Sequence, residues 1–153
     1  MPSSNKPKVK NNIHCNIVST ISFKPELFIE TVLAHLAIEN ASLEFTFFDN
    51  ASIHEMNKTY LNHDWPTDII TFDLSENSEE VAKTSPLEGD LYISVEQASI
   101  QASSLGHSLE KELKIVIIHG ILHLLGYDDQ TPEDQSEMDA KQHQIYDLLH
   151  TPA

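Results

Sequence analysis

Arginine is absent from this sequence of 153 residues, and all nine basic residues are lysines. Arginine is the side chain that grips a phosphate group with two parallel hydrogen bonds. The formal net charge of −15 at pH 7 adds a long-range repulsion of polyanions, which salt screens beyond about 10 Å. Composition alone therefore disfavours a role in nucleic-acid binding.

The sequence also predicts no disulfide, no transmembrane run and no secretory leader. Cys15 is the single cysteine, so the chain cannot form an internal disulfide, which fits a reducing cytoplasm. The longest apolar segment, around Ile115 to Ile118, is followed directly by His119, so no transmembrane span is predicted. The first twelve residues are polar, without the apolar centre of a signal peptide, and are expected to form a flexible tail. These features predict a cytoplasmic protein with no membrane partner.

What remains is the composition of one ordinary globular domain. Hydrophobic residues make up 40% of the chain, which is too many for general disorder. A chain of this length buries roughly two-thirds of the surface that its unfolded form exposes. No internal repeat or low-complexity linker divides the sequence, so we expect a single domain over residues 1–153.

The pattern of apolar residues predicts both strands and helices. Strands are predicted at residues 13–21, 43–48, 69–72 and 91–95. Helices are predicted at residues 25–38, 53–60, 96–105, 108–125 and 131–149. The first strand has the composition of an edge strand, whereas residues 69–72 and 91–95 are apolar enough to be interior strands. The expected class is α+β, or α/β-like, with a small mixed sheet of about four strands covered by about five helices.

The stretch "HGILHLLGYDD" at residues 119–129 carries the strongest chemical signal. His119 and His123 are four residues apart, so in a helix they project from one face about one turn apart. Gly126 can end the helix, and the turn after it can bring Asp129 back toward the two imidazoles. Two nitrogens, one carboxylate oxygen and an open fourth position describe a catalytic zinc site at the end of a buried helix.

Two other interpretations of this stretch compete with the zinc site. The histidines could be core residues that donate to backbone carbonyls, and the carboxylate ligand could be Asp128 instead of Asp129. The spacing is also close to the H-E-x-x-H-x-x-G-x-x-H arrangement of metalloproteases. Gly120 stands where those enzymes carry the glutamate that serves as general base, which argues against peptide hydrolysis.

Three stretches of the sequence resemble the YbeY family of bacterial endoribonucleases, which mature ribosomal RNA. "HGILHLLGYDD" matches the family pattern H-G-x-L-H-L-x-G-Y-D-H at every named position except the last. "NKTYLNHDWPTDIITF", from Asn57 to Phe72, corresponds to N-x-x-Y-R-x-x-D-x-x-T-D-V-L-S-F. "GDLYIS", at residues 89–94, corresponds to a strand with the pattern G-D-[IL]-x-[IL]-S.

Two departures from the family patterns concern function. The third histidine of the family is Asp129 here, which keeps a zinc ligand but adds negative charge beside the ion. The arginine of the second stretch, which the resemblance implies would act at the RNA, is Leu61 here. Lys58 could replace it only as a point charge.

By resemblance, the expected activity is zinc-dependent hydrolysis of single-stranded RNA in 16S ribosomal RNA 3′-end maturation and ribosome quality control. The expected partners are ribosomal RNA and the small ribosomal subunit. Thr67 and Asp68 would lie near the cleft, with turn bonds as their structural alternative. His63 and Asp68 are the candidates for the general base, and an ordinary loop position is the alternative for His63.

Further residues could either serve the function or be ordinary surface residues. His143 could support the metal site or be a surface residue of the last helix. The lysines near the N-terminus could touch RNA or belong to a solvated tail; they are Lys6, Lys8 and Lys10. The missing arginine and the charge of −15 also leave open a second function, a metal-stabilised ribosome-associated factor with little nuclease activity of its own.

Overall fold

The structure is a computed structural model that describes residues 11–17, 21–48, 69–74, 87–127 and 131–150. Its strands are β1 (Asn12–Ile17), β2 (Ser42–Phe48), β3 (Ile69–Asp73) and β4 (Glu88–Ser94). Its helices are α1 (Pro25–His35), α3 (Val95–Leu105), α4 (Leu109–Leu124) and α5 (Pro132–His150). The predicted class, α+β with a mixed four-stranded sheet, is confirmed. The fifth predicted helix, at residues 53–60, lies outside the described residues.

The strands follow the order β1-β2-β4-β3 across the sheet. β2 is parallel to both β1 and β4, whereas β3 is antiparallel to β4. The interior position predicted for residues 69–72 was therefore wrong, because β3 lies at an edge of the sheet that the described strands form. Its apolar composition has another cause, since Ile70 is only 2% exposed and Ile69 packs toward α4.

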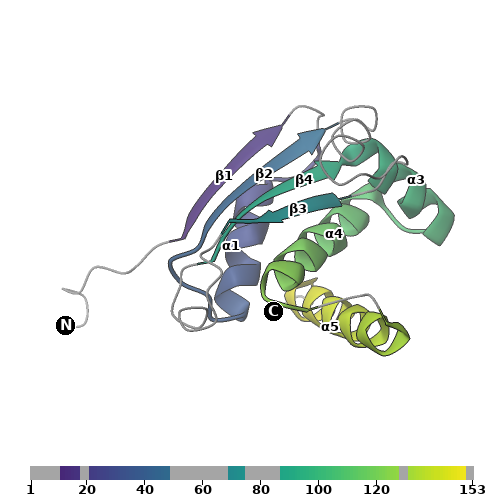
Figure 1. The fold of residues 1–153 in the computed structure, drawn as a ribbon. Helices are drawn as coiled ribbons and strands as arrows, with labels where there is room; N and C mark the ends of the chain where they lie inside the picture. Colours follow the sequence, from purple (N-terminus) through teal and green to yellow (C-terminus); the bar gives the residue numbers. More distant parts are fainter. Residues whose placement is uncertain (1–10, 18–20, 49–68, 75–86, 128–130, 151–153) are drawn as a thin grey trace.

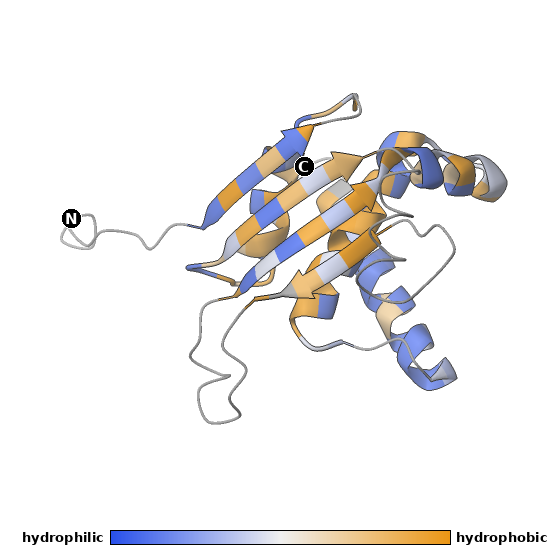
Figure 2. Ribbon diagram, turned by 45° about the horizontal axis from the view of Figure 1, so that its top comes forward, coloured by the Kyte–Doolittle hydropathy of each residue, from blue (hydrophilic) through white to orange (hydrophobic). Residues whose placement is uncertain are grey.

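The helices form a second and a third layer on one face of the sheet. α1 and α4 lie beneath the strands, and α5 lies on the far side of α4 (Figure 1). Alternating residues of the strands point into this layer, which gives the banded hydropathy along β1, β2 and β4 in Figure 2. The centre of the core consists of fully buried side chains from β2, β4, α1 and α4, among them Phe45, Leu91, Leu33 and Ile117.

Local sequence signals set the helix ends. The hydroxyl groups of Ser94, Ser108 and Thr131 accept hydrogen bonds from backbone N–H groups in the first turns of α3, α4 and α5. Gly126, which the sequence predicts as a helix stop, has a positive φ angle of 106°, and Gly106 after α3 has one of 77°. No helix in the described ranges is long and apolar enough to cross a membrane.

Candidate metal centre

The two histidines of the central motif lie side by side on the last turns of α4. Their rings are nearly parallel, with an interplanar angle of 11° and centroids 6.4 Å apart. His119 is half-buried and His123 is exposed, so the alternative of two core histidines does not describe this pair. One turn of helix therefore presents two imidazoles at the boundary between the protein interior and solvent.

A residue of α5, Gln142, holds the inner histidine. His119 Nδ1 lies 2.6 Å from Gln142 Oε1, and the Gln142 side chain is 6% exposed. An amide oxygen can only accept, so this hydrogen bond requires a proton on His119 Nδ1, which in the neutral ring leaves the lone pair on Nε2. This is the tautomer of a histidine that binds a metal through Nε2.

Gln142 was missed in the sequence, although a signal for it exists. It stands in the stripe of α5 that packs against α4, together with Met138 and Ile145, which are 1% and 0% exposed. These positions are i, i+4 and i+7 of one helix face. A glutamine in an otherwise apolar stripe needs a hydrogen-bond partner, and His119 is that partner.

Close packing explains why Gly120 stands between the two histidines. A Cβ atom at this position would lie 2.6 Å from Leu91 Cδ2 and 2.7 Å from Ile69 Cδ1. Position 120 therefore faces the sheet, where a side chain would displace Leu91 and Ile69. A glutamate here would point into this apolar contact and not toward a metal ion beside the histidines, which argues against peptide hydrolysis.

The "GDLYIS" stretch supports the C-terminal end of the same helix. A Cβ atom at Gly89 would lie 2.8 Å from Leu124 Cδ1. The side chain of Leu124, the last residue of α4, therefore packs against β4 at the position where the strand has a glycine. Beyond Leu124 the chain turns sharply. The N–H of Gly126 donates to the His123 carbonyl, and the N–H of Tyr127 donates to the Leu122 carbonyl, both over 3.1 Å. Two of the three family-like stretches therefore pack against each other.

The third predicted ligand cannot be placed from this structure. Asp129 and its alternative Asp128 lie outside the described residues, as do the predicted catalytic candidates His63 and Asp68 and their neighbour Thr67. Within the part of the chain that the structure describes, no group of three or more His, Cys, Asp or Glu side chains could hold a metal ion. The structure brings His119 and His123 together, and the rest of the ligand set stays a prediction.

His143 fits the surface interpretation. It is exposed, and its Nδ1 lies 2.8 Å from the carbonyl oxygen of Asp139, one turn earlier on α5. The residue before it in the chain, Gln142, makes the contact with the histidine pair instead.

A second buried polar group lies nearer the start of α4. Glu112 is 5% exposed, and its two carboxylate oxygens contact His107 Nε2 at 2.6 Å and Gln101 Nε2 at 2.9 Å. This cluster connects the C-terminal part of α3 to α4, and the later turns of α4 carry the histidine pair.

Cys15 on β1 is a poor candidate for a metal ligand, because burial and the nearby Glu26 raise the pKa of its thiol to about 12.

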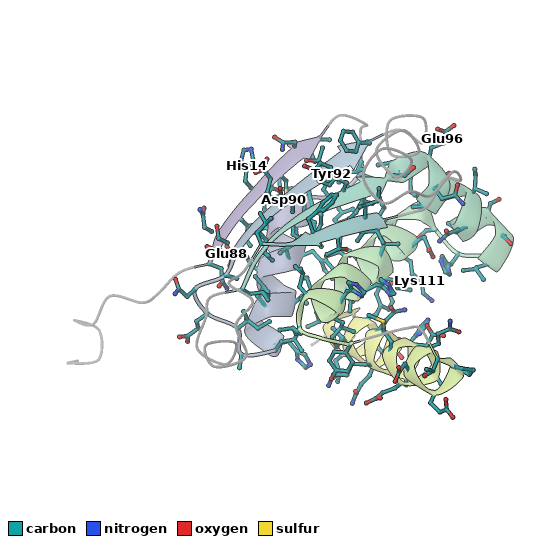
Figure 3. All side chains as sticks on the ribbon, viewed as in Figure 1. His14, Glu88, Asp90, Tyr92, Glu96 and Lys111 are labelled. Atoms are coloured by element: carbon teal, nitrogen blue, oxygen red, sulfur yellow. The ribbon has the colours of Figure 1, made fainter. Side chains whose placement is uncertain are left out.

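The opposite face of the sheet carries an acidic groove. This groove of about 310 Å³ is lined by residues from β1, β2 and β4, including Glu44. His14, Glu88 and Asp90, which also line it, are labelled in Figure 3. Glu44 and Asp90 are direct cross-strand partners. Partial burial and repulsion by Glu44 raise the pKa of the Asp90 carboxyl above its usual value. The three carboxylates of this groove, Glu44, Glu88 and Asp90, repel phosphate groups.

The donor set on the helical side suits zinc. Neutral imidazole nitrogens on successive turns are common zinc ligands, and an acceptor behind one of them fixes its orientation. The exposed edge at His123 leaves solvent access to such an ion.

Comparison with known proteins identifies relatives over most of the chain. The family model described as endoribonuclease YbeY matches residues 10–150. A protein named endoribonuclease YbeY from Exiguobacterium is 43% identical over 128 residues, which cover 76% of this chain and 81% of that protein. Its namesake from Acholeplasma laidlawii is 40% identical over 120 residues, covering 78% and 82% of the two chains. The solution structure of TM1509 from Thermotoga maritima superimposes with a TM-score of 0.56 at 26% identity, covering 90% of this chain and 87% of TM1509. The chain belongs to the YbeY family.

Proposed function

We propose that this chain is a zinc-dependent endoribonuclease that cleaves single-stranded RNA in the cytoplasm. Its substrate would be 16S ribosomal RNA, with roles in 3′-end maturation and in ribosome quality control, and its partner the small ribosomal subunit. The relatives at 40–43% identity are named endoribonucleases, which supports the reaction class. The zinc dependence, the RNA and the partner are proposals from the motif chemistry and the family likeness.

One observation carries the chemical part of the proposal: His119 and His123 lie side by side, and the Nδ1 atom of His119 lies 2.6 Å from Gln142 Oε1, so that Nε2 is the nitrogen left for a metal ion. His119, His123 and Asp129 would hold the ion. Zinc bound there would supply Lewis-acid chemistry, making a hydroxide available near neutral pH and offsetting charge on a phosphate oxygen. That second task matters in this chain because arginine is absent and Leu61 replaces the family's arginine.

The remaining steps fall to residues of the chain itself. His63 and Asp68 are the proposed candidates for proton transfer. Lysines must supply the cationic contacts to RNA. In the described part of the chain, Lys114 pairs with Glu110 at 2.9 Å, and Lys111 lies over the Tyr146 ring, so both side chains already have partners near α4. We therefore expect RNA binding to involve few phosphate contacts and to depend only modestly on salt.

The test is cleavage of a labelled single-stranded fragment from the 3′ region of 16S ribosomal RNA, beside the matching duplex. Purified protein should cut the single strand, lose activity with a chelator and regain it with zinc. His119→Ala should lower the rate by at least about a hundredfold, because removing a ligand removes the ion. His143→Ala is the matched control, since His143 is exposed and bonded within its own helix. Chelator-resistant cleavage, or equal loss in both variants, would contradict the proposal.

A second function is favoured by the charge of −15 and the absence of arginine. The chain could be a ribosome-associated factor that zinc stabilises and that has little nuclease activity of its own. In that case the protein would copurify with small-subunit components, and His119→Ala would lower its thermal stability while leaving its role in cells intact.

A further inference from the structure

We propose that Gln142 is a positioning residue that fixes the tautomer of His119 and thereby presents Nε2 as the metal-binding nitrogen. This inference rests on the proposed zinc function for its consequence. Its core, the state of the His119 ring, concerns the chain alone and can be measured without a metal.

The first step is the chemistry of the contact. A neutral imidazole carries its proton on either Nδ1 or Nε2, and the hydrogen bond at one nitrogen selects the role of the other. The contact between His119 Nδ1 and Gln142 Oε1 is 2.6 Å, which is short for an N–H···O hydrogen bond. Since Oε1 has no proton to donate, this contact requires the proton on Nδ1.

The second step is the rigidity of the acceptor. Gln142 is 6% exposed and follows Met138 by one helical turn, and Ile145 and Tyr146 follow it on the same face at 0% and 6% exposure. Lys111, labelled on α4 in Figure 3, lies 5.4 Å from the centre of the Tyr146 ring. α5 is therefore anchored to α4 on both sides of Gln142, and a polar group buried there is costly to leave without a partner.

The third step is the asymmetry of the histidine pair. His119 is half-buried and held from α5, whereas His123 is exposed one turn later at the end of α4. The inner ring therefore has a partner on α5 that sets its orientation, whereas the outer ring lies at the boundary with solvent. Loss of such an acceptor typically lowers metal affinity roughly 10–100-fold.

A merely structural contact between α4 and α5 would predict something else. Removing it would lower thermal stability, but it would change neither the ratio of His119 tautomers nor the affinity for zinc in protein that remains folded. Restoring any oxygen acceptor at position 142 would have no effect on these two quantities.

The experiment compares four full-length proteins: the natural chain, Gln142→Met, Gln142→Glu and Gln144→Leu. Methionine keeps the length and shape of glutamine but offers only a weakly accepting sulfur, whereas glutamate restores an oxygen acceptor. Gln144 is exposed on the same helix and provides the matched control. Long-range ¹⁵N–¹H spectra of the imidazoles, with His119 assigned through His119→Ala, report the tautomer before zinc is added. Competition with a chromophoric chelator then reports zinc affinity.

We expect the Nδ1–H tautomer of His119 in the natural chain, in Gln142→Glu and in Gln144→Leu. Gln142→Met should show a mixture of tautomers and a zinc affinity lower by roughly 10–100-fold. A folded Gln142→Met with the same tautomer and an affinity within about twofold would overturn the inference. If Gln142→Met does not fold, Gln142→Leu takes its place under the same criteria. A natural chain that binds no zinc would refute the proposed function instead, and the spectra of the metal-free proteins would still decide the tautomer.

Discussion

Gly120 and Gly89 show how single residues determine the position of the site. Each removes a side chain where α4 meets the sheet, Gly120 on the helix and Gly89 on β4. The helix can therefore lie against Leu91 and Ile69 while His119, the residue before Gly120, contacts α5. A glycine inside a helix costs about 1 kcal/mol relative to alanine, and close packing against the sheet offsets that cost.

Gly120→Ala is expected to destabilise the fold by about 1–2 kcal/mol. Forcing a methyl group into this contact costs about 1–3 kcal/mol, and the better helix propensity of alanine returns part of it. Urea unfolding monitored by circular dichroism measures the change. Because the added methyl group clashes with Leu91, Gly120→Ala should lower the free energy of unfolding less when Leu91→Ala is already present than it does in the natural chain. Strictly additive effects would contradict the packing argument.

Asp90 is the other residue whose environment has a measurable consequence. Burial and the Glu44 carboxylate raise its pKa in the folded protein, so the charged form destabilises the fold above that pKa. Below the ordinary pKa of aspartate, the carboxyl is protonated in both states and the penalty is gone. The free energy of unfolding therefore falls as pH rises from the ordinary pKa of aspartate, which Asp90 has in the unfolded chain, to its raised pKa in the folded protein.

Asp90→Asn should accordingly raise the melting temperature at pH 7 and have almost no effect near pH 3. The gain at pH 7 should shrink in high salt, because part of it comes from repulsion by Glu44. Glu88→Gln is the control, since Glu88 faces Ser42 across the strands and not a carboxylate. Thermal unfolding at the two pH values makes the measurement. An equal gain at pH 3, or a loss at pH 7, would show that the carboxylate has another role.

At the scale of helices and strands, α1 ends differently from its neighbours. α3 and α4 are each followed by a glycine with positive φ, whereas α1 is followed by Ala37 with φ of 58°. The N–H of Ile38 still donates to the Leu33 carbonyl at 2.9 Å, so the turn has the geometry that glycine favours. The backbone of Ala37 is strained in this conformation, because its Cβ atom lies close to the following carbonyl oxygen.

Ala37→Gly is expected to stabilise the protein by about 1 kcal/mol, because glycine adopts this conformation without strain. Asn40, with φ of 66°, offers the matched comparison. Asparagine tolerates this conformation better than alanine, so Asn40→Gly should gain less. Chemical denaturation of the two variants tests the difference. Destabilisation by Ala37→Gly would contradict the strain argument.

Helices were predictable from the sequence to within a few residues because their ends carry local signals. Ser108, Gly106 and Gly126 stand where capping chemistry requires them. The bounds and the order of the strands depend on partners that are distant in the chain, so they were predicted less well than the helices. Residues 69–72 were expected in the interior of the sheet, and β4 begins at Glu88, three residues before the predicted start. An apolar segment buried by a helix cannot be distinguished by composition from one buried between strands.

At the scale of the whole molecule, the site combines segments that the sequence alone does not bring together. The spacing of His119 and His123 predicted their shared face, because both lie on one helix. The contact with Gln142 was not predictable, since it requires the packing of α5 on α4 across 23 residues of sequence. The distribution of charge is also a property of the fold, because the pairing of β2 with β4 brings Glu44, Glu88 and Asp90 into one groove.

The most direct test of the account is elemental analysis of the purified chain, alone and as the His119→Ala, His123→Ala double variant. We predict about one zinc ion per natural chain and almost none in the double variant, with the fold of both confirmed by circular dichroism. A natural chain that is folded, active on RNA and free of zinc would contradict the central claim that this helix carries a catalytic metal site.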